Sequence, residues 1–472
     1  MDSRGQLHRL AGDTLVYGVT TAVVRALNFF LTPLYTNVLS PAELGEVSYL
    51  YALLAFVNVV LNLGWESAYM RFAVERQREE QGEVFALAWV GMAVNAGILG
   101  AVLWVLAPVL GRMLRLELLG TPGIRLAAAI AVCDALAVVP LAHLRLQRRL
   151  GLFSALRLGN AAVTVAATLF FLLVLRWGAL GVLWAGLIAS AVTAGATAPI
   201  LQRNFRWRWD GELWREMLRY GLPLVPTALS NIVLQVADRP ILMALTDAHS
   251  VGIYQANYRL ALPMLMFVVV FEYAWRPFFL EQLQRADAPR LFARVFALWN
   301  AVAACVFAAL ALWMPVLAQA RLGGVYVLHP AYWEGLGVVP IVAAGYGAYG
   351  IYVLAAAAAH IRKRTERLPI AMGAAAGVNV VLTLLLVPQL GYIGAAWATA
   401  GAYLVAAALI VVMSRRLYPV PYPWGTVAGF WGVVLLAAVL GGQGETLVAR
   451  LLASLGAGLG VGLWWGVRRQ SV

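Results

Sequence analysis

A chain of 472 residues that is 62% hydrophobic and only 12% charged is too apolar for a soluble multidomain protein. Its length is better counted in membrane spans of about 20 apolar residues each. Basic residues outnumber acidic ones by 35 to 22. In a polytopic membrane protein such an excess indicates basic cytoplasmic loops rather than nucleic-acid binding. Cys133 and Cys305 lie inside apolar runs, so we expect neither a disulfide nor a metal site.

The hydropathy pattern predicts an all-α polytopic membrane protein with about fourteen transmembrane helices. The polar opening MDSRGQLHRLAGD and the long, interrupted run after it do not resemble a cleaved signal peptide. Charged and Pro/Gly clusters separate the apolar runs. The predicted helices are 14–39, 45–70, 84–110, 123–144, 154–175, 179–201, 219–246, 251–278, 292–316, 334–360, 368–388, 391–413, 425–442 and 446–466.

Arginine placement predicts the orientation of these helices, because cytoplasmic loops are enriched in Arg and Lys. Most of the 35 basic residues fall on one side of the fourteen-helix topology, including those of the loops at Arg149, Arg208, Arg364 and Arg416. We therefore expect both termini in the cytoplasm of a multi-pass protein. The outer loops are short, the longest being about 319–333, which disfavours an external catalytic domain.

Three short similarities, in the same order, indicate an internal duplication. Residues 17–49 resemble 220–254, with LSPAELG against LTDAHSVG at the turn. WGALGVLWAG resembles LGYIGAAWAT, and YMRF resembles AWRPF. Six helices per unit is an even number, so the repeats share one orientation, as in many two-lobed transporters. The predicted domains are a lobe at 1–202, a cytoplasmic amphipathic linker at 203–218, a second lobe at 219–414, and two additional helices with a cytoplasmic tail at 415–472.

The stretches LSPAELGEVSYLYALLAF, LRYGLPLVPTALSNIVLQVADRPILMAL, DAHSVGIYQANYRLALPM, FEYAWRPFF and LGYIGAAWATAGAY resemble the polysaccharide flippases of the multidrug/oligosaccharidyl-lipid/polysaccharide exporter superfamily. The resemblance implies a V-shaped pair of six-helix bundles in a bacterial inner membrane. It implies alternating access that moves an isoprenoid-diphosphate-linked oligosaccharide outward, for lipopolysaccharide or exopolysaccharide synthesis. Lipid II flippases of the same superfamily also resemble this pattern, with fourteen helices of which two are C-terminal additions. A lipid II flippase is therefore an alternative.

Two further alternatives are a cation-coupled multidrug exporter and, from another class, a membrane glycan polymerase or ligase. We expect no enzyme activity and no cofactor, since the sequence has no GxxxxGK[ST] loop for ATP and few titratable outer residues. The expected partners are the lipid-linked oligosaccharide, membrane lipids, a coupling ion (H⁺ or Na⁺) and polysaccharide-assembly proteins, without nucleic acid.

Charges inside spans are costly, so they predict a wet cavity or an ion pair. Arg25 lies near mid-depth in the first helix, with Asn28 on the same face, and its planar fork suits the diphosphate that the resemblance implies. The alternative for Arg25 is an ion pair with Asp134 of the fourth helix.

The second lobe carries similar candidates near one outer turn. Asp238 and Arg259 have matching depths, which predicts an ion pair and leaves Arg239 for the cavity. The functional alternative makes Arg259 a second cationic contact. Tyr254, Asn257 and Tyr258 are candidates for hydrogen bonds to a sugar, although tyrosines are also common at membrane interfaces.

Two carboxylates at the cytoplasmic ends of helices two and eight predict a pseudo-symmetric gate. Glu66 is followed by Arg71, and Glu272 by Arg276. Ion pairs that form in one conformation only would bias a switching equilibrium. The alternative is a solvated helix end with a surface ion pair. The basic, Trp-rich linker after Gln202 predicts an amphipathic helix on the inner membrane surface.

Overall fold

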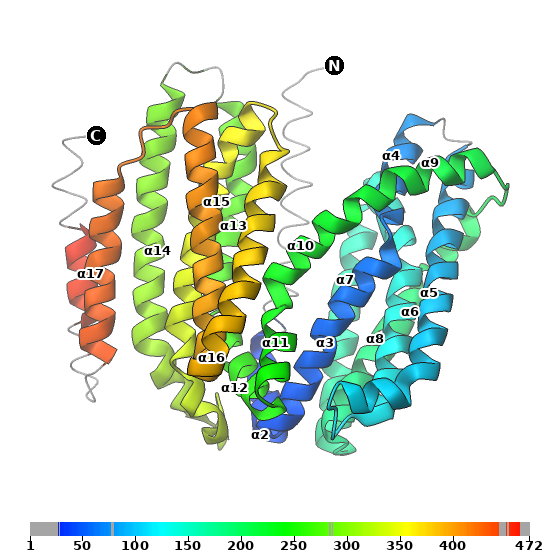
Figure 1. The fold of residues 1–472 in the computed structure, drawn as a ribbon, viewed down its shortest axis with the longest axis horizontal. Helices are drawn as coiled ribbons and strands as arrows, with labels where there is room; N and C mark the ends of the chain where they lie inside the picture. The colour runs from blue at the N-terminus through cyan, green and yellow to red at the C-terminus, as the bar shows by residue number, and fades with distance from the viewer. Residues whose placement is uncertain are drawn as a thin grey trace. The chain divides into compact units, whose positions relative to one another are not determined.

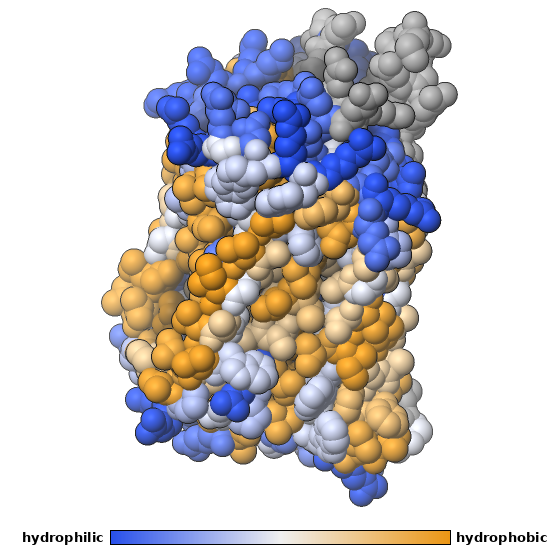
Figure 2. Space-filling model, turned by 90° about the vertical axis from the view of Figure 1, so that its right-hand side faces the viewer, coloured by the Kyte–Doolittle hydropathy of each residue, from blue (hydrophilic) through white to orange (hydrophobic). Residues whose placement is uncertain are grey.

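The computed structural model describes residues 27, 29–76, 80–282, 285, 287–442, 450 and 453–462. The described chain is helical apart from its loops and one small hairpin (Figure 1). Among these residues, nine helices are long and apolar enough to span a membrane, and a tenth follows if a bent pair counts as one span. The all-α polytopic membrane fold is therefore confirmed. One face has a hydrophobic band between two hydrophilic ends (Figure 2).

The chain forms two compact units. The first is built mainly from Val38–Met243 and Asp247–Gly252, and the second from Thr32–Asn37 and the chain after Ile253. The segment 219–243, which the repeat assigns to the second lobe, thus clusters with the first unit, because α10 (Val225–Val236) packs against α3 (Pro41–Asn62). The predicted lobe boundaries and the V-shaped arrangement stay predictions.

Long antiparallel helices make the body of the first unit (Figure 1). The strongest packing is between α5 and α6, followed by α6 with α8 and α7 with α8. Most predicted spans correspond closely to these elements. The helices are α4 (Trp65–Glu75), α5 (Gln81–Met113), α6 (Gly120–Leu146), α7 (Leu150–Leu169) with the π-helical turn η1 (Phe170–Val174), α8 (Gly178–Asn204), α9 (Gly211–Gly221), the 3₁₀ turn η2 (Leu222–Leu224) and α11 (Asp238–Leu245).

The second unit packs α15 against α16 most extensively, with α14 also contacting α17. The loop predicted at 319–333 contains a hairpin of two two-residue strands and a 3₁₀ turn. Asn37 fixes the hairpin, because its amide donates to the Tyr326 carbonyl at 2.7 Å. The elements are α2 (Thr32–Val38), α12 (Ala248–Leu260), α13 (Leu262–Glu281), α14 (Ala288–Gln319), β1 (Arg321–Leu322), β2 (Val325–Tyr326), η3 (Pro330–Gly335), α15 (Val338–Ile361), α16 (Arg367–Leu417) and α17 (Trp424–Gly442).

Glycine geometry supports the duplication that the sequence predicts. Gly178 and Gly391, aligned by the repeat, have φ values of 55° and 56°, in the left-handed region that favours glycine. Gly391 breaks α16 into the two spans predicted at 368–388 and 391–413. The two repeats thus share a local backbone conformation at this position.

A second pair of aligned glycines forms a very close helix crossing. A Cβ added to Gly45 would lie 1.7 Å from the carbonyl oxygen of Ala248, and one on Gly252 would lie 1.8 Å from that of Pro41. The clashes are reciprocal, so each glycine lies against the backbone of the other helix, α3 or the start of α12. Only glycine allows these backbones to approach so closely.

The linker forms the predicted amphipathic helix, α9, whose apolar face packs against the protein, while Trp207 and Trp209 before it are exposed. Contact of the linker with the inner membrane surface stays a prediction. Leu213 and Met217, one turn apart, are buried against the protein, and the Trp214 ring lies 4.6 Å from that of Trp65 on α4. Asp210 caps the helix, and hydrogen bonds from the backbone N–H groups of Leu213 and Glu212 lower the pKa of its carboxyl. The cap is therefore ionised at neutral pH and weakens only as the pH falls through that lowered pKa.

We predict that Gly45→Ala lowers stability, because the new methyl group must push two helix backbones apart. Overpacking of this kind costs about 1–3 kcal/mol of unfolding free energy. Gly97→Ala is the matched control, since Gly97 lies inside α5 with open space around its Cβ position. Thermal unfolding in detergent measures both. Equal melting temperatures for the two variants would contradict the close crossing.

Candidate functional site: intramembrane charges

The structure determines the surroundings of most, not all, of the predicted site residues. Arg25 and Asn28 lie outside the described residues. Asp134, on α6, is half-buried, hydrogen-bonds to the Ser190 hydroxyl of α8 and interacts electrostatically with Arg157 of α7. Its predicted pairing with Arg25 therefore stays a prediction.

Asp238 and Arg239 lie at a break in the seventh predicted span, where α10 and α11 meet at 57°. Both side chains are buried. The Arg239 guanidinium donates to Asp238 Oδ1 at 2.8 Å and to the Gln235 carbonyl at 2.7 Å, while Asp238 also accepts from the Arg239 backbone N–H. The two side chains therefore form hydrogen bonds with backbone groups that have no helical partner at the bend.

Arg259 is on α12, in the second unit, with its guanidinium 5.1 Å from the centre of the Tyr35 ring. This distance is typical of a cation–π contact. The ion pair predicted between Arg259 and Asp238 stays a prediction, as does the role of Arg259 as a cationic contact.

The candidate sugar ligands on α12 lie in the core of the second unit. Tyr254 and Asn257 are completely buried. The Asn257 amide donates to the Tyr332 carbonyl at 2.9 Å, and Tyr346 donates to the Tyr258 hydroxyl at 2.6 Å. The Asn257 bond holds η3 on α12, and the Tyr346 bond joins α15 to α12. Substrate contact by Tyr254 or Asn257 would require this packing to open.

The two predicted gate carboxylates differ in their partners. Glu272 pairs with Arg276 at 2.6 Å, one turn away on α13. Glu66 instead pairs with Arg145 of α6, and Arg71 pairs with Glu75 at 3.4 Å. The reason is helical spacing: residues i and i+4 share a face, whereas Glu66 and Arg71 are five apart and point in different directions.

Arg145 and Arg157 were not among the predicted site residues. In the structure both guanidinium groups approach the ring of Phe153, at 6.0 Å and 5.7 Å from its centre. The signal available was the position of Arg157, inside the predicted span 154–175 with apolar residues on both sides. An intramembrane arginine is a functional candidate by default.

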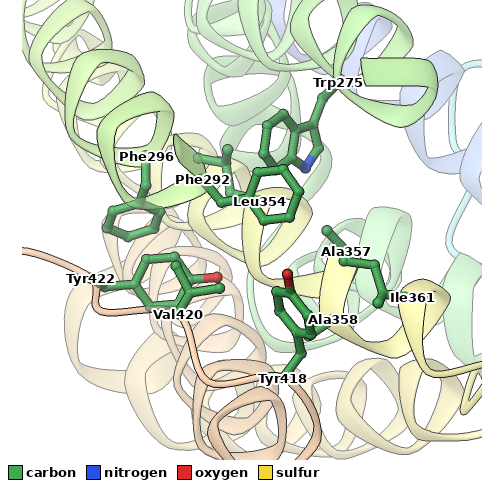
Figure 3. Close-up of a pocket in the computed structure, with 10 residues that line it drawn as sticks. All are labelled: Trp275, Phe292, Phe296, Leu354, Ala357, Ala358, Ile361, Tyr418, Val420 and Tyr422. Atoms are coloured by element: carbon green, nitrogen blue, oxygen red, sulfur yellow. The ribbon is translucent and has the colours of Figure 1, made fainter. Parts of the chain in front are cut away.

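A small aromatic pocket lies in the second unit, between α13, α14, α15 and the α16–α17 connection (Figure 3). Its walls include Trp275, Phe296, Tyr418 and Tyr422. Burial raises the pKa of both tyrosines, so they stay neutral donors at physiological pH. Phe296 of α14 packs against Tyr422 and Trp424, which attaches the start of α17 to α14.

Comparison with known protein families assigns this chain to one of them. A family model described as polysaccharide biosynthesis protein matches residues 10–282, more than half of the chain. The chain belongs to the polysaccharide biosynthesis protein family. No curated protein matches it in a direct sequence comparison.

Solved structures with the same fold come from the superfamily that the sequence resembles. The lipid II flippase MurJ in an inward closed conformation matches with a TM-score of 0.76 at 14% identity, over 97% of this chain and 99% of that chain. An inward-facing multidrug resistance MATE family transporter of the MOP superfamily matches at 0.63 and 15%, over 84% and 97%. The Vibrio cholerae MATE transporter VcmN in the bent form matches at 0.56 and 15%, over 87% and 97%. At these identities the likeness establishes the fold, that of a flippase or transporter.

Double-mutant cycles will identify the energetic partner of Asp238. Removing Asp238 or Arg239 alone leaves a buried charge uncompensated, at a cost of about 3–5 kcal/mol, whereas Asp238→Asn with Arg239→Gln should cost less than the sum. The same cycle with Arg259→Gln tests the predicted second pair. Thermal stability in detergent is the measurement. Strict additivity with Arg239 would contradict the observed ion pair as a stabilising contact.

Proposed function

We propose that this protein is a flippase that moves an isoprenoid-diphosphate-linked oligosaccharide across the bacterial inner membrane for polysaccharide biosynthesis. Membership of the polysaccharide biosynthesis protein family carries the proposal. The flippase fold and the arginines inside the spans support it, because a diphosphate must be compensated while it crosses hydrocarbon. Transport proceeds by alternating access, driven by an ion gradient or the membrane potential, with Asp134 and Asp238 as coupling candidates and without enzymatic chemistry.

Lipid II is the second candidate substrate. The match to MurJ extends over nearly the full length of both chains, whereas the match to the multidrug transporter covers 84% of this one. This coverage favours a flippase over a drug exporter, but it does not distinguish lipid II from another lipid-linked glycan as the substrate. The arginines also disfavour cationic drugs on Coulomb grounds.

Deletion of the gene separates the two substrates. If the proposal is right, an undecaprenyl-linked glycan repeat accumulates on the cytoplasmic face and cell-wall synthesis continues. The measurement is mass spectrometry of extracted lipid-linked glycans. Arrested peptidoglycan synthesis with accumulated lipid II would instead assign the lipid II role.

We expect Arg25→Ala to abolish transport while the protein remains in the membrane, and Arg25→Lys to restore part of it. The reason is that lysine supplies the charge but not the planar fork that binds phosphate oxygens in pairs. Complementation of the deletion strain, normalised to membrane expression, measures the effect. Full complementation by Arg25→Ala would remove Arg25 from the substrate site.

The proposed topology places both termini in the cytoplasm, with the loops at Arg149, Arg208, Arg364 and Arg416. Single cysteines at these loops should resist a membrane-impermeant thiol reagent in intact cells and react after permeabilisation. Cysteines in the hairpin at Gly323 and Gly324 are the positive control, because this topology puts them outside. Labelling of any of the four loops in intact cells would overturn it.

A further inference from the structure

Two arginines of the first unit converge on one phenylalanine ring. Arg145 is in the last turn of α6, and Arg157 is on the next helix, α7. Their guanidinium carbons lie 6.0 Å and 5.7 Å from the centre of the buried Phe153 ring. Two like charges this close repel each other, so the arrangement needs anions nearby.

The neighbouring carboxylates are shared unequally between the two arginines. Glu66 pairs with Arg145 and also accepts from the Asn62 amide. Arg157 interacts electrostatically with Glu66 and with Asp134, yet none of the described carboxylates lies within 4 Å of its guanidinium. The Arg145 Nε, which is buried, also has no hydrogen-bond partner among the described residues. Donors therefore remain available at both arginines.

The depth of Arg157 argues that its own donors face water. It lies seven residues inside α7, or about 10 Å at 1.5 Å per residue. The side chain is exposed, and an arginine facing lipid would cost a few kcal/mol. Its electrostatic partners are on α4 and α6, so it points toward the polar side chains of its own unit.

We propose that Arg157 and Arg145 form a phosphate-binding site in the cytoplasmic half of the first unit, and that Glu66 occupies Arg145 when the site is empty. Guanidinium groups bind phosphate oxygens through paired, charge-assisted hydrogen bonds. An incoming phosphate displaces the Glu66 carboxylate from Arg145. The inference rests on the proposed function only for the carrier of the phosphate, a lipid-linked diphosphate entering from the cytoplasm.

The charge balance gives this site a distinctive signature. Two arginines and two carboxylates make a neutral cluster, in which Glu66 competes with the ligand. Neutralising Glu66 should therefore strengthen phosphate binding, whereas neutralising Arg157 should weaken it. A purely structural ion pair would weaken the protein in both variants and strengthen nothing.

The experiment measures binding of farnesyl diphosphate to the full-length protein in neutral detergent by isothermal titration calorimetry, with farnesol as the uncharged control. Arg157→Gln should weaken farnesyl diphosphate binding about tenfold, and Arg157→Lys less. Glu66→Gln should tighten it several-fold. Glu75→Gln, which removes another ion-paired carboxylate from α4, and Arg203→Gln, which removes an exposed arginine from α8, should leave it unchanged.

Equal affinity for farnesyl diphosphate and farnesol would overturn the site, as would unchanged binding in Arg157→Gln. Weaker binding in Glu66→Gln would overturn the displacement of that carboxylate. If Arg157→Gln does not fold, Arg157→Lys and Glu66→Gln decide the question. The binding assay does not depend on transport. If Arg157 contributes to binding but the deletion strain accumulates no lipid-linked glycan, the proposed function is wrong while the phosphate site stands.

Discussion

The constraint on which this structure depends is that hydrocarbon satisfies no polar group, so the protein must do so itself. Glu46 shows the principle: its fully buried carboxylate accepts hydrogen bonds from the backbone N–H groups of Glu117, Leu118 and Leu119, just before α6 begins. Asp238 and Arg239 do the same at the break between α10 and α11. At both places, buried charges complete the hydrogen bonding of a helix end.

The same constraint explains how far sequence reasoning reaches. Spans were predictable because about 20 apolar residues in a row leave few alternatives, and the repeat was predictable because Gly178 and Gly391 need the same unusual φ. Side-chain partners were not, since they depend on which helices pack together. Glu66 has an arginine five residues ahead in sequence, yet its partner is Arg145, 79 residues away.

The linker shows a related limit. Its apolar stripe correctly predicted an amphipathic helix, but a stripe does not reveal what covers it. Trp65 on α4 faces Trp214 at 4.6 Å, so protein covers this part of the stripe. Arg71 adds a cation–π contact to Tyr220 at 4.9 Å. These contacts fix α9 to α4 within the first unit.

Glu66 and Glu272 occupy matching positions in the two repeats, but their ion pairs differ. The Glu272–Arg276 pair lies within one helix, so it survives any rigid movement of that helix and contributes equally to every conformation. The Glu66–Arg145 pair joins α4 to α6 and changes whenever those helices separate or a competing anion enters. Only an interaction that differs between states can bias a conformational equilibrium. Any gating by these carboxylates is therefore asymmetric, and it belongs to the first unit, where Arg157 lies.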